Sequence, residues 1–181
     1  MDGFLVIDKP AGWTSHDVVA RVRRLAGQKR VGHTGTLDPD ATGVLVVCLG
    51  FAGRLIEYTE GYAKRYVARL ALGIETDSQD ASGTPVNTSD ASHVTAEDLQ
   101  AVLPRFRGSI LQVPPMVSAV RHHGERLHEI ARRGETVERP PRPVTVMRLG
   151  ASDFRPGPLA TARLEVECSA GTYVRTLCHD I

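Results

Sequence analysis

The chain has 181 residues and a mass of 19.6 kDa, with 41% hydrophobic residues, 24% charged residues and a net charge of +1. This is the size and composition of an ordinary globular protein, which needs neither disulfides nor metals to fold. The three cysteines, Cys48, Cys168 and Cys178, are odd in number and lack C-x-x-C spacing. We therefore expect reduced thiols and neither a disulfide framework nor a zinc site.

The longest apolar run, Val44–Leu49, is too short to span a membrane, and no basic region followed by a long apolar stretch opens the chain. We therefore expect no signal peptide, no membrane partner and a cytoplasmic location. The charges are unevenly distributed: residues 1–70 carry ten Lys/Arg against seven Asp/Glu, 101–150 carry nine against four, and 71–100 carry none against six. Two basic segments around an acidic one are compatible with a phosphate-binding face, and equally with solvated charge on helix surfaces.

The first half of the chain alternates apolar runs with turn residues. Phe4–Ile7 predicts a short buried strand, and Ser15 is a good N-cap for a helix that Gly27 ends. The expected buried face of that helix consists of Val18, Val19, Val22, Leu25 and Ala26. After residue 43 the sequence predicts a strand over Val44–Leu49, a short helix through Leu55 and Ile56, a strand over Tyr66–Leu72, and a polar surface excursion over residues 75–92.

In the second half, Thr95 and Asp98 form a capping-box pattern, with Asp in place of the usual Glu, at the start of a helix. Its expected buried face is Leu99, Val102, Leu103 and Phe106. The prolines of "VPPMVSA" and "RPPRPV" favour extended chain. The other predicted elements are a short helix around Leu127, Ile130 and Ala131 that ends at Gly134, strands over Val144–Leu149 and Ala160–Cys168, and a helix with Val174, Cys178 and Ile181 on one face. These patterns predict an α+β fold with a mixed, largely antiparallel sheet flanked by helices, in one domain over residues 1–181.

The segment "VGHTGTLDPDATGVLVV", residues 31–47, is the strongest candidate site because it places carboxylates on a glycine-rich loop. Three interpretations are open. "DPDAT" matches the D-x-D-x-T pattern of haloacid-dehalogenase-like phosphohydrolases, although there the motif follows an apolar strand and here it precedes one. "GHTG" is a G-x-x-G element of the kind that clamps RNA backbones. The loop could also be a structural turn in which Asp38 acts as a cap. The neighbours His122 and His123 point in divergent directions, which disfavours a metal site.

Five segments in a fixed order decide between these interpretations. They are "DKPAGWTSHDVV", "GHTGTLDPDATGVLVVCLG", "KRYVARLALG", "PPMVSAVRHHGERLHEIAR" and "CSAGTYVRTLCHDI". Together they resemble the TruB family of tRNA pseudouridine synthases, from Leu5 to Ile181. The resemblance implies the pseudouridine synthase catalytic fold and an isomerase that converts a T-loop uridine of tRNA to pseudouridine. Members of the family are longer, so we expect this chain to lack the end of the catalytic domain and the C-terminal RNA-binding domain.

The resemblance also implies roles for individual residues. Asp38 matches the catalytic aspartate, and Arg175 matches the arginine that pairs with it. Tyr66 matches the tyrosine that stacks on the target base, Tyr173 is expected to line the same pocket, and His33 stands where a residue fills the gap left by the flipped base. Lys9 is expected to support the pocket or to contact a phosphate of the RNA backbone. Lys64 and Arg65 are expected to contact the RNA backbone. Whether Asp38 attacks the ribose or the uracil is open.

The family chemistry needs no cofactor and no metal, and its partner is the T-arm stem-loop of tRNA, bound by a monomer. Between residues 114 and 134 the sequence departs from the family pattern at Val117, Arg121 and His128, so no RNA contacts are assigned there. An alternative of another class is an RNA-binding or chaperone-like module that keeps the fold without catalysis. The presence of Asp38, Tyr66 and Arg175 argues against it, and the short chain argues for it.

Overall fold

The computed structural model describes residues 1–59 and 61–181. The chain forms two compact units, Met1–Tyr62 and Ala63–Ile181, which we describe separately. Neither composition nor spacing contained a sign of this division. In both units every strand pair is antiparallel, as the alternating patterns predicted.

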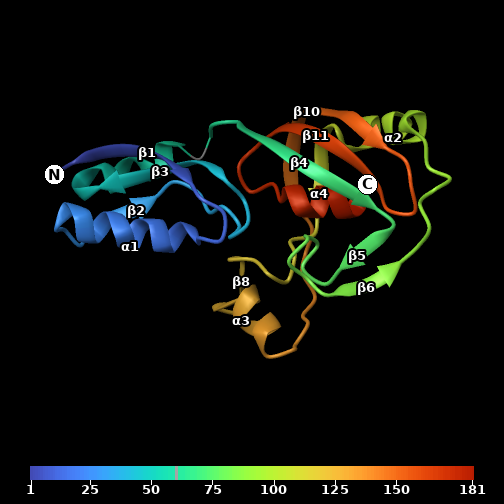
Figure 1. Cartoon of the computed structure of the whole chain (residues 1–181). Helices are drawn as coiled ribbons and strands as arrows, with labels where there is room; N and C mark the ends of the chain where they lie inside the picture. The colour runs from blue at the N-terminus through green and yellow to red at the C-terminus, as the bar shows by residue number, and fades with distance from the viewer. Residues whose placement is uncertain (60) are drawn as a thin grey trace. The chain divides into compact units, whose positions relative to one another are not determined.

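The first unit is a small sheet with a helix along it (Figure 1). Its elements are β1 (Gly3–Lys9), α1 (Ser15–Ala26), β2 (Val31–His33), β3 (Gly43–Leu49) and the 3-10 helix η1 (Gly50–Thr59). The strand order is β1-β3-β2, so β3 is central. One apolar cluster joins Val18, Val19 and Val22 of α1 to Leu45, Val47 and Leu49 of β3 and to Val31.

Three expectations for this unit need correction. Strand β1 forms as predicted, but it is an edge strand and its side chains Phe4, Leu5 and Val6 are 45%, 42% and 73% exposed, so it is not buried. Helix α1 is capped by Thr14, whose side chain accepts a hydrogen bond from the Asp17 amide, and not by Ser15. Gly27 ends the helix in the left-handed conformation, with φ of 62°, as expected. Leu25 is 71% exposed and does not belong to the buried face.

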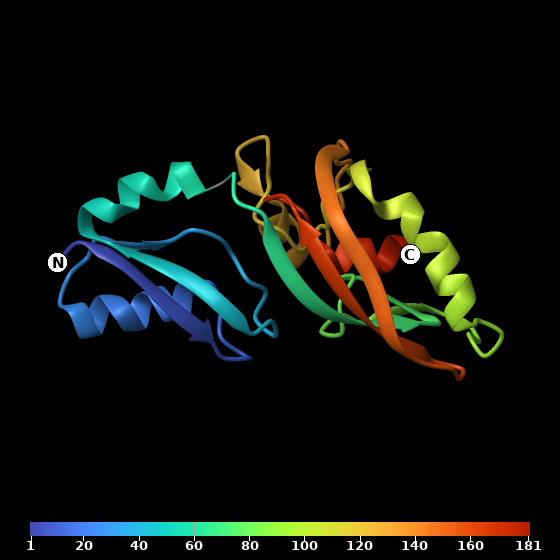
Figure 2. The same ribbon diagram turned by 90° about the horizontal axis from the view of Figure 1, so that it is seen from above.

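The second unit is built on a four-stranded sheet with the order β4-β11-β10-β7 (Figure 2). Its strands and helices are β4 (Lys64–Leu72), β5 (Ile74–Thr76), β6 (Pro85–Thr88), α2 (Ala96–Val102), η2 (Leu103–Phe106), β7 (Gly108–Gln112), β8 (Arg121–His122), β9 (Glu125–Arg126), α3 (Leu127–Arg132), β10 (Arg142–Arg155), β11 (Ala160–Cys168) and α4 (Val174–Asp180). The predicted excursion over residues 75–92 contains the two-stranded sheet of β5 and β6, and β8 pairs with β9.

The core of the second unit lies on one face of this sheet. Strand β11 alternates buried and less buried residues along its length, which confirms the period of two in its sequence. Its inward side chains, among them Leu164 and Val166, pack with Leu99 and Leu103 from the α2–η2 segment and with Leu177 of α4. Helix α2 has the predicted capping box, in which the Asp98 carboxylate accepts from the Thr95 amide at 3.0 Å.

Candidate active site

The loop between β2 and β3 is fixed on both sides of Asp38. Before it, the Leu37 amide donates to the hydroxyl of Ser15 at 2.9 Å, and Leu37 packs against the core of the first unit. After it, the Pro39 carbonyl accepts from the Gly12 amide at 2.9 Å and from the Lys9 ammonium at 2.8 Å. The half-buried Asp38 itself begins a turn, which the Ala41 amide closes on its carbonyl at 3.1 Å. Its backbone position is therefore set by neighbours from β1, α1 and the segment between them.

Lys9 is the central support of this arrangement. Its side chain is fully buried, and its ammonium also donates to the carbonyls of Pro10 at 2.9 Å and Trp13 at 2.5 Å. Burial lowers the pKa of Lys9, while the charges of Asp40, Asp38 and Asp17 act in the opposite direction. A fully buried ammonium that is bonded to three carbonyls is not placed to contact RNA backbone, so that expectation is corrected. The observed contacts hold the Asp38 loop, and the support of the base-binding pocket that the resemblance implies stays a prediction.

His33 lies at the end of β2, half-buried, opposite Val47 of β3. The Thr34 amide continues the pairing by donating to the Val46 carbonyl at 3.0 Å. The first unit thus brings three of the predicted site residues, Lys9, His33 and Asp38, onto β1, β2 and the loop that follows β2.

In the second unit, Arg175 and Tyr173 lie together at the start of α4. The Arg175 guanidinium carbon is 5.8 Å from the centroid of the Tyr173 ring, and the Arg175 side chain is only 10% exposed. The backbone of Tyr173 is held by Gln112 of β7, a residue that is 2% exposed: the Tyr173 amide donates to the Gln112 side chain at 2.8 Å, and Gln112 donates back at 3.0 Å. These contacts fix the start of α4 relative to the sheet.

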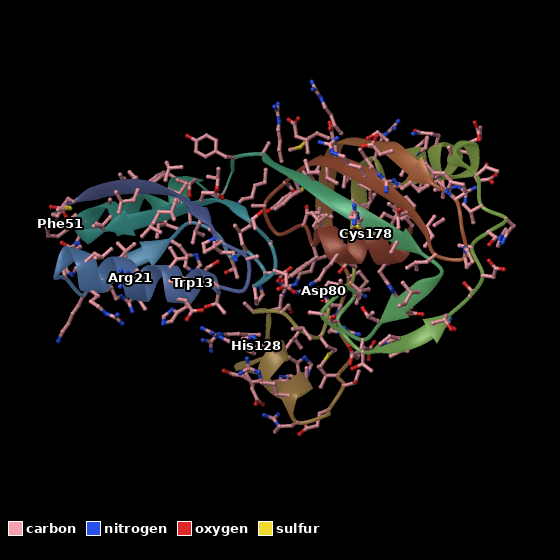
Figure 3. The ribbon with its side chains drawn as sticks, in the orientation of Figure 1. Trp13, Arg21, Phe51, Asp80, His128 and Cys178 are labelled. Carbon is pink, nitrogen blue, oxygen red and sulfur yellow. The ribbon has the colours of Figure 1, made fainter. Side chains whose placement is uncertain are left out.

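The structure adds Asp80, a residue that the sequence analysis missed, to this cluster. Asp80 is labelled in Figure 3. Arg175 donates to the Asp80 carboxylate at 3.1 Å and also to the Val117 carbonyl. Burial raises the pKa of Asp80, but hydrogen bonds from Ser82, Ser78 and Arg175 outweigh burial and hold this pKa below its usual value. The carboxylate is therefore ionised at neutral pH. The sequence does contain a signal for this turn: Ser78 and Ser82 each stand two residues from Asp80, and Ser and Asp at such spacing are typical of turns held by side-chain hydrogen bonds.

The segment that carries Asp80 is anchored to α4 at a second point. The Thr176 hydroxyl, in a residue that is 2% exposed, donates to the Gln79 side chain at 2.6 Å. Gln79 has φ of 64°, a conformation that a residue with a side chain adopts only where its surroundings hold it.

Tyr66 lies on β4, as do Lys64 and Arg65, the two residues predicted to contact the RNA backbone. Tyr66 is half-buried opposite Val166 of β11 and packs against the core of the second unit. The Arg65 side chain is 76% exposed and donates to Glu167 at 3.1 Å, whereas Lys64 is half-buried opposite Cys168. Arg65 therefore retains solvent access on the face of the sheet opposite Tyr66, because successive side chains of a strand alternate between faces.

The cysteines offer no thiolate nucleophile. Burial raises the pKa of all three thiols, and for Cys178 it raises the pKa to about 11. All three thiols are free and protonated at neutral pH. Within the described residues, no three His, Cys, Asp or Glu side chains are grouped so that they could hold a metal ion. The described part of the chain also contains no helix with the length and apolarity to cross a membrane.

The comparisons with known proteins agree with this architecture. Residues 23–174 match the TruB family pseudouridylate synthase (N terminal domain), and the chain belongs to this family. The chain is 56% identical to the tRNA pseudouridine synthase B of Symbiobacterium thermophilum and 54% identical to that of Heliobacterium modesticaldum, in each case over its whole length. It spans about 60% of the length of these relatives.

Solved structures show the same fold. The "Crystal Structure of a Cbf5-Nop10-Gar1 Complex" contains a chain with 30% identity and a TM-score of 0.68, over 98% of this chain and 43% of the other. The "Structure of H/ACA RNP bound to a substrate RNA containing 2'-deoxyuridine" gives 28% identity and a TM-score of 0.64, over 98% and 41%. The predicted α+β fold of a pseudouridine synthase is confirmed.

Proposed function

We propose that this chain carries the catalytic residues of a tRNA pseudouridine synthase that acts on a T-loop uridine, with Asp38 as the catalytic carboxylate. The observation that carries the proposal is the fixation of the Asp38 loop on both sides, by Ser15 through Leu37 and by Lys9 and Gly12 through Pro39. A carboxylate that must meet one atom of a bound nucleotide needs a fixed backbone, because small displacements are costly in catalysis.

The reaction breaks the bond between the base nitrogen and the ribose, turns the uracil, and rejoins it to the ribose through a ring carbon. The nitrogen gains a proton and the carbon loses one, so substrate and product are isomers and no electrons are transferred. An Asp is already ionised at neutral pH, and Asp38 can therefore act as a nucleophile or stabilise positive charge without activation. Pairing with Arg175, which the family resemblance implies, would orient the carboxylate and stabilise its burial.

The remaining site residues would bind the extracted base. Unstacking one base costs a few kcal/mol, and stacking on an aromatic side chain returns about 1–3 kcal/mol, so Tyr66 can offset much of the cost. Tyr173 would line the same pocket, and His33 would occupy the gap in the loop that the base leaves. Asp80 would hold Arg175 in place through its carboxylate. Arg65 and Lys64 would approach the RNA backbone.

The partner we propose is the T-arm stem-loop of tRNA, bound by a monomer in the cytoplasm. The three free thiols are consistent with a reducing compartment. No cofactor or metal is proposed, because an isomerisation of this kind needs neither.

The test is conversion of uridine to pseudouridine in a T-arm stem-loop, detected by carbodiimide labelling. Asp38→Asn keeps the shape of the side chain and removes its charge, so turnover should vanish while RNA binding survives. Asp40→Asn is the matched control, since it removes a charge from the same loop near the same lysine. Conversion by Asp38→Asn would refute the catalytic role.

A second outcome would favour the alternative of an RNA-binding module without catalysis. This alternative is considered because the chain spans about 60% of the length of the relatives it matches. Wild-type chain that binds the stem-loop and converts none of it would be an RNA-binding module. A phosphohydrolase would instead cleave phosphate esters and lose that activity with a chelator.

A further inference from the structure

A second surface of the first unit, on the exposed side of α1 and the residues before it, combines an aromatic side chain with two arginines. A hollow of about 590 Å³ lies along α1, a volume within the range of small-ligand sites. Its lining is Gly12, Trp13, Asp17, Ala20, Arg21 and Arg24. None of these residues belongs to the catalytic or base-binding set proposed above.

The spacing of these residues forms one stripe on the helix. At about 3.6 residues per turn, positions 17, 20, 21 and 24 follow one another along the same side of α1, just beyond Trp13. Ala20 has the smallest side chain of this stripe and stands one turn before Arg24. Figure 3 shows Trp13 and Arg21 along this helix. Trp13 is 42% exposed, so this residue is accessible to a ligand.

The charges in the hollow leave one net positive charge. The Asp17 carboxylate is occupied by the helix cap, where it accepts from the Thr14 amide at 2.8 Å and the Thr14 hydroxyl at 2.6 Å. Those hydrogen bonds lower the pKa of Asp17, which is therefore charged. No hydrogen bond or ion pair with another described residue is found for Arg21 or Arg24. Two available guanidinium groups thus stand beside one carboxylate that is already engaged.

We propose that this hollow binds one nucleotide unit of a single-stranded RNA segment, with the base stacked on Trp13 and the phosphate paired with Arg21 and Arg24. Aromatic stacking with arginine contacts to the backbone is the usual way in which proteins hold unpaired nucleotides. A phosphodiester carries one negative charge, which matches the net charge of the hollow. A free nucleoside di- or triphosphate would bring more negative charge close to Asp17, and the hollow offers it only two cations.

This RNA contact goes beyond the isomerase reaction, but it shares backbone with the loop that carries Asp38. The Trp13 carbonyl accepts from the Lys9 ammonium at 2.5 Å, and the Gly12 amide donates to the Pro39 carbonyl at 2.9 Å. A nucleotide held on Trp13 therefore rests on the segment that supports the catalytic loop.

The experiment uses tryptophan fluorescence, because Trp13 is the only tryptophan in the chain. An oligouridylate should quench the emission saturably, since a stacked base contacts the indole directly. Uridine monophosphate at the same nucleotide concentration should quench less, because only a strand can also bind other basic residues of the chain and so raise its effective concentration at Trp13. Equal quenching by the mononucleotide would overturn the assignment to RNA.

Variants separate the two parts of the hollow. The double variant Arg21→Ala, Arg24→Ala should weaken oligouridylate binding to Trp13 about tenfold at low salt, and the slope of log affinity against log salt should become shallower by about 0.7, the value for one phosphate of a single strand. Ala20→Leu keeps every charge, replaces one good helix former with another and places a larger side chain within the hollow, so it should weaken the quenching. Arg105→Ala, in an exposed residue of η2, is the matched control and should change nothing.

The proposal fails if oligouridylate binding, followed by anisotropy of a labelled strand, leaves Trp13 emission unchanged. It also fails if Ala20→Leu binds and quenches as the wild type does. Neither readout depends on turnover, so an inactive chain would not affect the result, and a failed hollow would leave the proposed isomerase intact.

Discussion

Replacing Lys9 with Met tests whether a buried ammonium holds the Asp38 loop. Met has a similar length and no charge, so the substitution removes three hydrogen bonds and little volume. The Pro39 carbonyl keeps its bond from the Gly12 amide, whereas the carbonyls of Pro10 and Trp13 no longer have the Lys9 donor. Both carbonyls belong to exposed residues, so we take the low end of the cost of an unsatisfied group, about 1 kcal/mol each.

The two unsatisfied carbonyls together cost about 2 kcal/mol. The substitution also removes the unfavourable burial of a charged ammonium, which lowers the pKa of Lys9 in the wild type, so the net cost is smaller. We therefore expect Lys9→Met to lower the free energy of unfolding by about 1–2 kcal/mol, or the melting temperature by about 2–8 °C for a chain of this size. Thermal melts followed by circular dichroism measure both quantities. Lys29→Met, at an exposed lysine, is the control.

The pH dependence gives this experiment a second readout. Since the pKa of Lys9 is lowered in the folded state, the unfolded chain binds more protons between that pKa and 10.5. The stability of the wild type relative to Lys9→Met should therefore rise with pH through this window. A variant as stable as the wild type at neutral pH, with a difference that does not change with pH, would refute the supporting role of Lys9.

Three further outcomes are expected. Asp80→Asn should reduce the loss of stability on acidification below pH 3.8, because the carboxylate of the wild type has a lowered pKa in the folded state and its stabilising contribution is lost as the pH falls from 3.8 through that folded-state pKa. Acid unfolding followed by circular dichroism measures this, and the same acid unfolding curve in the variant would exclude the Asp80–Arg175 pair as a stabilising contact. Replacing both Lys64 and Arg65 with Ala should make the salt dependence of tRNA binding shallower by about 0.9 for each duplex phosphate that the variant no longer neutralises, whereas an unchanged slope would remove them from the interface. Gly27→Ala, at φ of 62°, should cost about 1 kcal/mol in urea unfolding, and a neutral result would mean that the end of α1 relaxes freely.

Local sequence determined the elements whose signals lie within a few residues. Helix α1 ends at Gly27 because glycine tolerates the left-handed conformation, and the box of Thr95 and Asp98 begins α2 because both partners lie on one turn. The alternation of β11 is visible because strand period and burial coincide. The ordered motifs, not any of these signals, pointed to the family and to Asp38.

Tertiary structure decided what depends on distant partners. The Lys9 ammonium bonds a carbonyl 30 residues away, and Arg175 bonds Asp80 across 95 residues, separations at which no local pattern records a contact. The same holds for Ser15, which resembles a cap in the sequence but uses its hydroxyl to hold Leu37. Strand β1 was expected to be buried because it is apolar, but burial depends on what packs against a strand, and β1 is at the edge of its sheet. Backbone conformation is a local property, whereas the neighbours of a side chain are set by the whole fold.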